Sequence, residues 1–548
     1  MFDLKKTLSI TLVKLLLLLW CLSLAACAMR IPITGGPKDE AKPKIIYTRP
    51  ANYTTNFTAK TIEIEFDEYI DFKDLSKQLI ISPIIAKEPE IAIKKKSIII
   101  KLPDSLLQDV TYTINFGDAI VDTHESVSFE DFQYVFSTGA QLDSLQINGD
   151  IKFAENLKTE KGIYALLYKN TSDTVVFGTL PDYYSKTDEN GQFVIKNLKA
   201  GTYKLFALKD ANNNYKFDSK TEQIAFSAAP VTIPDTTIYH LKLFVEPDTL
   251  PQLLKAQYVS KGKSIIVFTA PVNQFIFKTI APTVVSFNDL IFEKSDDNDS
   301  VYVYCTDTLV DSLHAVVYNG LVSVDTIHVN LKSSRLVKEK VVAVAEGINI
   351  LTNLNSGILE TSKTLTLTFD TPIKSFDLTT THLSVDFITP VKFTMAAADS
   401  INKNYSINFN AEENKSYRLV ILKGAATSVF NQSNDTITLP FKTRELKDYA
   451  SIQLAVNTAE SNINYLVQLI TETDVVVRQQ KVKNNQKVSF EYLLTGKYKM
   501  RLIYDTNNNE RWDNGSYATK LQPEKVIYYP DVINTRANWD VELNWSIK

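Results

Sequence analysis

The sequence predicts an all-β protein in which β-sandwiches follow one another along the chain. Residues 62–66 and 365–369 alternate apolar and polar side chains, which is typical of a strand with one face on a core and one in water. β-rich runs of this kind alternate with Asn, Asp, Gly and Pro roughly every ten residues, and helical periodicity is scarce. This spacing favours sandwiches over barrels or parallel α/β sheets.

A first internal repeat indicates that one sandwich type occurs more than once. Its residues Phe66-Asp67, Ile70 and Asp74-Leu75 recur 303 positions later as Phe369-Asp370, Ile373 and Asp377-Leu378. Further along, Tyr112, Phe136 and Thr138 recur 305 positions later as Tyr417, Phe441 and Thr443. A weaker third copy matches residues 268–272 to residues 369–373. We call this the A type.

A second repeat defines a B type. Gly201, Tyr203-Lys204, Asp210, Asn212-Asn213-Asn214 and Asp218 recur 295 positions later as Gly496, Tyr498-Lys499, Asp505, Asn507-Asn508-Asn509 and Asp513. The order along the chain is therefore A, B, a divergent A, A and B, which we expect to form a rod or a curved array. The predicted domains are 45–140, 141–247, 248–335, 336–446 and 447–548, after a segment 1–26 and a linker 27–44.

The first segment predicts export and lipidation. An apolar run behind Lys5 and Lys6 ends in Leu24-Ala25-Ala26-Cys27, which reads as a lipobox. Lys14 leaves an uncharged core of roughly ten residues, which suits a signal peptide rather than the ~20 residues of a spanning helix. The mature chain is then expected to begin at Cys27 and to be anchored to a membrane by lipid on that cysteine.

Composition narrows the function classes. The chain has 548 residues, of which 44% are hydrophobic and 22% charged, with a net charge of -4. That charge argues against nucleic acid as a partner, because phosphate binding needs a basic face. Once Cys21 is removed and Cys27 carries lipid, Cys305 is the cysteine that remains, and its strand-like surroundings predict a small buried side chain.

Two families resemble parts of the chain. The residues that resemble the SbsA-type bacterial Ig-like domain are Lys42-Pro43-Lys44, Arg49-Pro50, Phe66-Asp67-Glu68, Tyr112-Thr113-Ile114 and Phe136-Ser137-Thr138. The stretch Thr34-Gly35-Gly36-Pro37-Lys38-Asp39 resembles a group of Gram-negative lipoproteins that carry this domain. Asp188-Glu189-Asn190-Gly191, Leu198 and Ala200-Gly201-Thr202-Tyr203 resemble transthyretin-like or carboxypeptidase-regulatory-like sandwiches. These resemblances imply spacers, adhesion modules and complex components, and they bring no catalytic residues.

One motif carries metal chemistry. The pattern is Asp210, Asn212, Asn214 and Asp218, repeated as Asp505, Asn507, Asn509 and Asp513. Oxygen atoms at every second residue of a curled loop suit Ca²⁺. The loops differ from an EF-hand at two positions. Position six is Tyr215 or Glu510 instead of glycine, and position twelve is Thr221 or Ser516 instead of a bidentate glutamate. The alternative is an Asn-rich turn, because Asn tolerates left-handed backbone. We expect no required cofactor, and structural Ca²⁺ stays open.

The sequence suggests no catalytic constellation. His124, His240, His314, His328 and His382 are scattered singly, without the spacing of a zinc site or a nucleophile–base pair. Glu63 and Glu65 are expected to share the solvent face of one strand.

Aromatic residues in or near the B units keep a binding hypothesis open against core packing. These are Tyr183-Tyr184, Tyr528-Tyr529, Trp512, Trp539 and Trp545. Exposed rings could stack on sugars or dock a protein. Trp539 and Trp545 are six residues apart, so a strict strand puts both on one face, which favours a shared core.

We therefore expect a non-enzymatic outer-membrane lipoprotein that acts as a structural or interaction module, as an accessory subunit of an outer-membrane protein complex. The alternative is an adhesion or carbohydrate-binding lipoprotein. Ala28 lacks the aspartate of inner-membrane retention, and residues 28–31 lack acidic side chains, so the sequence leaves the periplasmic and cell-surface sides both open.

Overall fold

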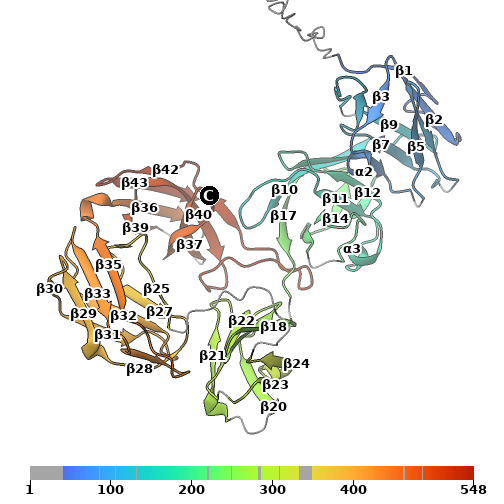
Figure 1. The fold of residues 1–548 in the computed structure, drawn as a ribbon. Coiled ribbons are helices and arrows are strands. Elements are labelled where there is room, and N and C mark those ends of the chain that lie inside the picture. Colours follow the sequence, from blue (N-terminus) through green and yellow to red (C-terminus); the bar gives the residue numbers. More distant parts are fainter. Residues whose placement is uncertain are drawn as a thin grey trace, which may run out of the picture. The chain divides into compact units, whose positions relative to one another are not determined.

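The computed structural model describes residues 41–547 except 86, 105, 131, 219–220, 249, 282–285, 308, 333–347, 459, 461–462 and 484. In these residues nearly all regular structure is β, which confirms the predicted fold class (Figure 1). The segment 1–26 and Cys27 lie outside the described residues. Contacts divide the chain into two compact units. The first comprises the described residues up to Gln146 with Pro181–Ser185 and Ile195–Gly201, and the second comprises the rest.

The first A-type sandwich contains a four-stranded sheet in the order β1-β2-β6-β5, a three-stranded sheet β4-β7-β9 and the pair β3-β8. Its elements are β1 Ile45–Arg49, β2 Thr61–Phe66, β3 Ile70–Phe72, α2 Leu75–Gln78, β4 Ile80–Ser82, β5 Glu90–Lys94, β6 Ser97–Lys101, β7 Thr111–Asn115, β8 Ile120–Asp122 and β9 Gln133–Ser137. Strand β2 alternates as predicted. Ile62, Ile64 and Phe66 are buried in the core, while Glu63 and Glu65 are partly exposed.

The divergent and the later A-type sandwiches repeat this topology. Sheets β18-β19-β22-β21 and β25-β27-β32-β31 correspond to β1-β2-β6-β5. Opposite them lie β20-β23-β24 and β26-β35-β33-β29-β30, and β28-β34 corresponds to β3-β8. Phe66, Phe268 and Phe369 each end the strand that lies second in the order of their four-stranded sheet, and they are at most 2% exposed. The three-fold A repeat is thus confirmed by strand order as well as by residues.

The elements of the divergent A sandwich are β18 Leu253–Ser260, β19 Lys263–Phe268, β20 Phe275–Ala281, η1 Phe287–Asp289, β21 Leu290–Lys294, β22 Ser300–Cys305, β23 Ser312–Asn319 and β24 Val322–Asn330. Those of the next A sandwich are β25 Ile350–Thr352, β26 Ile358–Leu359, β27 Leu365–Phe369, β28 Ile373–Phe376, η2 Leu378–Thr380, β29 Thr381–Val385, β30 Thr389–Pro390, β31 Phe393–Ala397, β32 Asn404–Phe409, β33 Ser416–Ile421, β34 Ala426–Ser428, β35 Ile437–Thr443 and η3 Leu446–Asp448.

The two B-type sandwiches share a second topology, in which the first strand pairs in parallel with the last. Strand β10 pairs with β17 in this way, and β36 pairs with β43. The run β11-β14-β15 of one copy corresponds to β37-β40-β41 of the other. In the first copy β15 also pairs with β17, so its strands form one eight-stranded sheet, whereas the second copy has two separate sheets. The short strands β16 and β42 pair with β14 and β40. The B repeat is therefore also confirmed by its topology.

The elements of the first B sandwich are β10 Leu145–Phe153, β11 Tyr164–Tyr168, α3 Val175–Gly178, β12 Tyr183–Lys186, β13 Gln192–Leu198, β14 Gly201–Lys209, β15 Gln223–Phe226, β16 Val231–Ile233 and β17 Ile238–Val245. Those of the second are β36 Ala450–Thr458, β37 Asn464–Thr471, β38 Val476–Val482, β39 Gln486–Leu493, β40 Gly496–Asp505, β41 Val526–Tyr528, β42 Ile533–Thr535 and β43 Asp540–Ile547.

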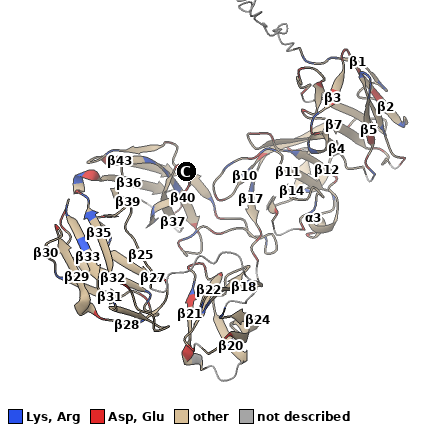
Figure 2. Ribbon diagram, in the orientation of Figure 1, with Lys and Arg blue, Asp and Glu red and all other residues tan. Residues whose placement is uncertain are grey.

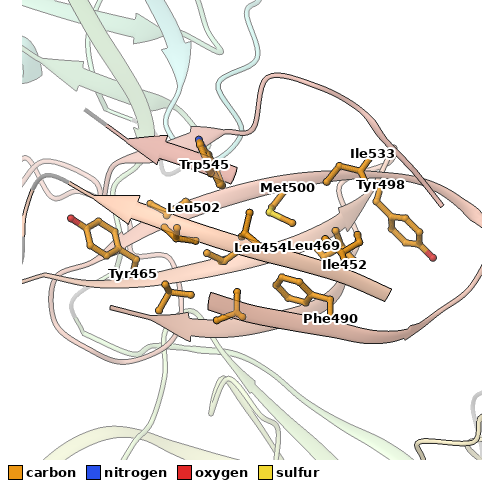
Figure 3. Packing of buried hydrophobic residues seen from close by; sticks show 14 of the residues in the cluster. Ile452, Leu454, Tyr465, Leu469, Phe490, Tyr498, Met500, Leu502, Ile533 and Trp545 are labelled. Atoms are coloured by element: carbon orange, nitrogen blue, oxygen red, sulfur yellow. The ribbon is translucent and has the colours of Figure 1, made fainter. Parts of the chain in front are cut away.

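The core of the second B sandwich shows how alternation builds a sandwich. Ile452 and Leu454 on β36 meet Met500 and Leu502 on β40, and Trp545 on β43 belongs to the same cluster (Figure 3). Each of these residues is nearly inaccessible to water, and burying a side chain of this size stabilises the fold by about 1.5–3 kcal/mol. The protein has no disulfide among its described residues, so cores of this kind carry its stability.

Candidate functional site

The two Asp/Asn loops follow β14 and β40, and each closes into a compact turn. In the first, the carboxylate of Asp210 accepts three backbone N–H groups of the loop at 2.7–3.0 Å. The side-chain amides of Asn212 and Asn214 donate to the two carboxylate oxygens of Asp218, at 3.0 and 2.7 Å. The structure thus brings all four predicted residues together.

The second loop repeats the arrangement. The carboxylate of Asp505 accepts two backbone N–H groups at 3.0 and 3.1 Å. Asn507 and Asn509 donate to Oδ2 of Asp513 at 2.6 and 2.7 Å. The conformation also recurs, because Tyr215 and Glu510 both have a positive φ, at 63° and 61°. Position six of each loop therefore takes the left-handed backbone that an EF-hand gives to glycine.

Sequence reasoning missed a buried glutamate at the base of each loop. Glu222 is 1% exposed and accepts the N–H groups of Ala211 (3.3 Å) and Asp218 (3.0 Å). Glu524 is 8% exposed and accepts those of Thr506 (2.7 Å) and Asp513 (3.2 Å). The signal for them is weak, because they follow the shared aspartate by four residues in one copy and by eleven in the other.

These loops present hard oxygen atoms, which are the ligands that Ca²⁺ prefers. The carboxylates and side-chain amides of the eight predicted residues also hydrogen-bond within the loops, so the same groups hold an Asn-rich turn. The carboxylate and amide oxygens of the loops are suitable ligands for Ca²⁺, and calcium binding stays a prediction.

The histidines are not all isolated. His314 and His328 face each other on neighbouring strands β23 and β24, with Nε2 and Nδ1 3.0 Å apart, and Asn330 contacts the other nitrogen of His328 at 2.9 Å. His240 contacts Asp150 across β10 and β17. The expectation of singly scattered histidines is wrong for these pairs, because cross-strand neighbours have no fixed spacing in sequence.

Asp122, His124 and Glu125 also lie together, with one ligand atom of each within 4.8 Å of the others. The Asp122 carboxylate accepts the backbone N–H groups of His124, Glu125 and Val127 at 2.5–2.8 Å. Burial raises the pKa of this carboxyl, but these backbone hydrogen bonds outweigh burial and hold the pKa below its usual value. Asp122 therefore holds a turn.

Cys305 is 1% exposed in the core of the divergent A sandwich, and burial raises the pKa of its thiol. A buried thiol with a raised pKa is a poor nucleophile. The prediction of a small buried side chain is confirmed.

The aromatic residues of the B units divide between core and surface. Tyr183, Tyr184 and Trp545 are buried, whereas Trp539 is 52% exposed beside Arg536, whose guanidinium lies 4.9 Å from the ring centroid. The prediction that both tryptophans lie in one core is therefore wrong for Trp539. The reason is that β43 begins at Asp540, so strand alternation does not extend back to residue 539.

Charged residues of both signs are distributed over the strands (Figure 2). Among the described residues, no helix is long and apolar enough to span a bilayer.

Comparison with known proteins supports the fold of two regions. The model of a bacterial Ig-like domain (Big_5) matches residues 39–138, and that of an uncharacterised protein family conserved in bacteria (DUF2141) matches residues 155–246. The second match is to a family whose function is not described, and the transthyretin-like resemblance stays an expectation. No curated protein matches the chain.

Solved structures of surface proteins show weaker likeness. The S-layer protein rSbsC(31-844) is 13% identical over 84% of this chain, with a TM-score of 0.14, and the match spans 64% of that protein's length. The major pilin subunit BcpA of Bacillus cereus is 10% identical over 74% of this chain and 99% of the pilin, also at 0.14. SGBP-B of the Bacteroides ovatus mixed-linkage glucan utilization locus is 12% identical over 72% of this chain and 96% of its own, at 0.19. Likenesses this weak carry no functional argument.

Proposed function

We propose that the protein is an outer-membrane lipoprotein, anchored through lipid on Cys27, that acts as a non-enzymatic structural or interaction module. Its role is that of an accessory subunit in an outer-membrane protein complex. The observation that carries this proposal is Leu24-Ala25-Ala26-Cys27 behind a short apolar segment, followed by a tandem array of sandwiches. The lipid sets the location, and the sandwiches present loops and sheet faces to partners.

A non-enzymatic role is supported by buried and turn-forming carboxylates whose hydrogen bonds hold loops of the fold. Asp122, Asp210 and Asp505 accept backbone N–H groups of their own turns. Glu222 and Glu524 hold the bases of two loops. These carboxylates therefore stabilise loops. Loops that are held by a rigid scaffold are where binding residues concentrate, which fits an interaction module.

The test is an affinity pull-down from detergent-solubilised membranes with the full chain tagged at its C-terminus. Stoichiometric recovery of an outer-membrane barrel or its lipoproteins is the expected result. Cys27→Ala removes the anchor and is the matched control for membrane proximity, so it should lose or weaken the recovery. Recovery of the chain alone contradicts the complex-subunit role.

Carbohydrate or adhesion binding is the alternative, and exposed Trp539 is the observation that favours it. A flat ring next to a guanidinium can stack on a sugar. Binding to a glycan array that is abolished by Trp539→Ala supports this alternative. Tyr53→Ala, which removes a ring that is 60% exposed in another sandwich, is the control and should leave this binding unchanged.

Protease treatment of intact cells distinguishes the periplasmic from the cell-surface side of the outer membrane, since only a cell-surface chain is digested.

A further inference from the structure

Tyr517 belongs to the second B sandwich but is buried against the first. It lies in the hairpin formed by residues 514–523, where Ser516 and Leu521 form a bridge. Only 3% of Tyr517 is exposed, although it is not part of the core of its own sandwich. Its ring centroid lies 5.1–5.9 Å from those of three phenylalanines of the first B sandwich: Phe177, Phe206 and Phe226. Aromatic pairs at this separation attract one another.

Hydrogen bonds surround this aromatic contact. The Tyr517 hydroxyl donates to the carbonyl oxygen of Asp173 at 2.8 Å. The carboxylate of Glu246 accepts from Oγ of Ser516 (2.7 Å) and from the backbone N–H of Tyr517 (2.6 Å) and Ala518 (3.3 Å). A carboxylate with three donors from one hairpin fixes the position of that hairpin, since hydrogen bonds to charged groups are the strong ones.

Further polar contacts extend the same interface. Nε2 of Gln522 donates to the carbonyl oxygen of Phe226 at 3.0 Å. Away from the hairpin, Nη1 of Arg501 donates to the carbonyl oxygen of Glu155 at 3.2 Å, and Lys158 pairs with Asp474 at 2.6 Å. All residues of this contact, from both B sandwiches, lie within the second compact unit, so the contact joins parts of one unit that are far apart in sequence.

The hairpin is an addition to the B fold. In the first copy, Asp218 and Glu222 are four residues apart, whereas the equivalent Asp513 and Glu524 are eleven apart. Both glutamates accept the N–H of the corresponding aspartate, so the two ends of the loop are equivalent in the copies. The segment between the aspartate and the glutamate is therefore seven residues longer in the second copy, and this longer segment, residues 514–523, is the hairpin that carries Tyr517. A segment present in one copy only, and packed on the other copy, has the character of a docking element.

We propose that the hairpin of residues 514–523 is an intramolecular clasp, and that its partner is the surface of the first B sandwich formed by Asp173, Phe177, Phe206, Phe226 and Glu246. The clasp joins the second B sandwich to the first B sandwich, so that the chain between the two sandwiches forms a closed loop. Because both halves belong to one chain, the clasp operates at a high effective concentration and needs no external partner.

The test cuts the chain inside this closed segment. A protease site is inserted after Asp248 of the chain expressed from residue 28 onward, which lacks the apolar segment and the lipid, and the purified protein is cleaved. The clasp predicts that the two pieces co-elute in size-exclusion chromatography at micromolar concentration. Tyr517→Ala should weaken their association at least about 30-fold, as for a central interface residue, and the pieces should separate.

Two further variants keep the test decisive. Phe177→Ala removes the contact from the other side and should separate the pieces even where Tyr517→Ala impairs the last sandwich. Trp539→Ala removes an exposed ring of the same sandwich and should leave them together. Separation of the unsubstituted pieces, or co-elution that neither clasp variant disturbs, overturns the proposal. An uncut chain of doubled mass that Tyr517→Ala returns to a single chain also overturns it, in favour of hairpin exchange between two copies.

Discussion

At the residue scale, Tyr112 and Tyr417 show how a repeated side chain fixes a repeated loop. The hydroxyl of Tyr112 accepts the N–H of Leu107 at 2.9 Å, and that of Tyr417 accepts the N–H of Glu412 at 2.8 Å. Each ring stacks on the phenylalanine that shares its repeat, with centroids 5.4 and 5.3 Å apart. A tyrosine that bonds back to the chain a few residues upstream is the tyrosine corner of Ig-like sandwiches.

Tyr112→Phe is expected to weaken the first sandwich by about 1 kcal/mol, because the N–H of Leu107 loses its acceptor while the ring still fills the core. Hydrogen exchange of peptides covering β7 in the full chain measures the opening free energy. Tyr53→Phe, at an exposed ring of the same sandwich, is the control. Equal exchange in both variants would falsify the corner's role.

The Asp122 turn gives a pH-dependent prediction. The folded-state pKa of this carboxyl lies below that of the unfolded chain, about 3.9, so its stabilisation is present above that value and is lost as pH falls through the folded pKa. Asp122→Asn is therefore expected to lower the melting temperature of the first sandwich clearly at pH 7, and by progressively less as the pH falls below about 3.9. A difference between the two proteins that does not change with pH contradicts this account.

Calcium distinguishes the two interpretations of the Asp/Asn loops. If each loop binds with a Kd of about 1 mM, 10 mM Ca²⁺ adds about 1.4 kcal/mol of stability per loop to chelator-treated protein. The paired variant Asp218→Asn and Asp513→Asn should lose this effect, while Asp531→Asn, at an exposed position, should keep it. Melting that is unchanged by Ca²⁺ leaves the loops as Asn-rich turns.

At the element scale, β43 shows where strand alternation applies. Trp545 lies inside the strand, is 6% exposed and packs edge to face on Tyr529 at 5.6 Å, whereas Trp539 precedes the strand. Trp545→Ala is expected to destabilise the last sandwich by about 3–5 kcal/mol, and Trp539→Ala by less than about 0.5 kcal/mol. Hydrogen exchange of peptides covering β36 and β40 measures both. Similar losses in the two variants would mean that Trp539 also packs in the core, which contradicts a start of β43 at Asp540.

Sequence patterns predict the elements well where one residue type has one structural role. The phenylalanines of the A repeat mark buried strand ends, and Leu198 and Leu493 are buried just before the equivalent strands β14 and β40 of the two B sandwiches. The pairing of His314 with His328 was not predictable, because it depends on which strands become neighbours. Strand limits, such as the start of β43, depend on local turns and are the hardest to predict from a pattern.

At the scale of the whole molecule, the order of the five sandwiches follows from the two internal repeats, but contacts between distant sandwiches do not. The expected rod or curved array leaves out the contact of Tyr517 with the first B sandwich. The loop that carries Tyr517 is seven residues longer than its counterpart, but this difference in length does not indicate which surface the loop contacts. Interfaces depend on shape and on several separate segments at once, so periodicity cannot find them.

The measurement that tests the central claim most directly is mass spectrometry of the protein purified from outer membranes. The account predicts an N-terminal peptide that begins at Cys27 and carries a diacylglycerol with a further acyl chain, and a Cys27→Ala chain that is not lipidated. An unmodified Cys27, or a mature chain that retains residues 1–26, would contradict it.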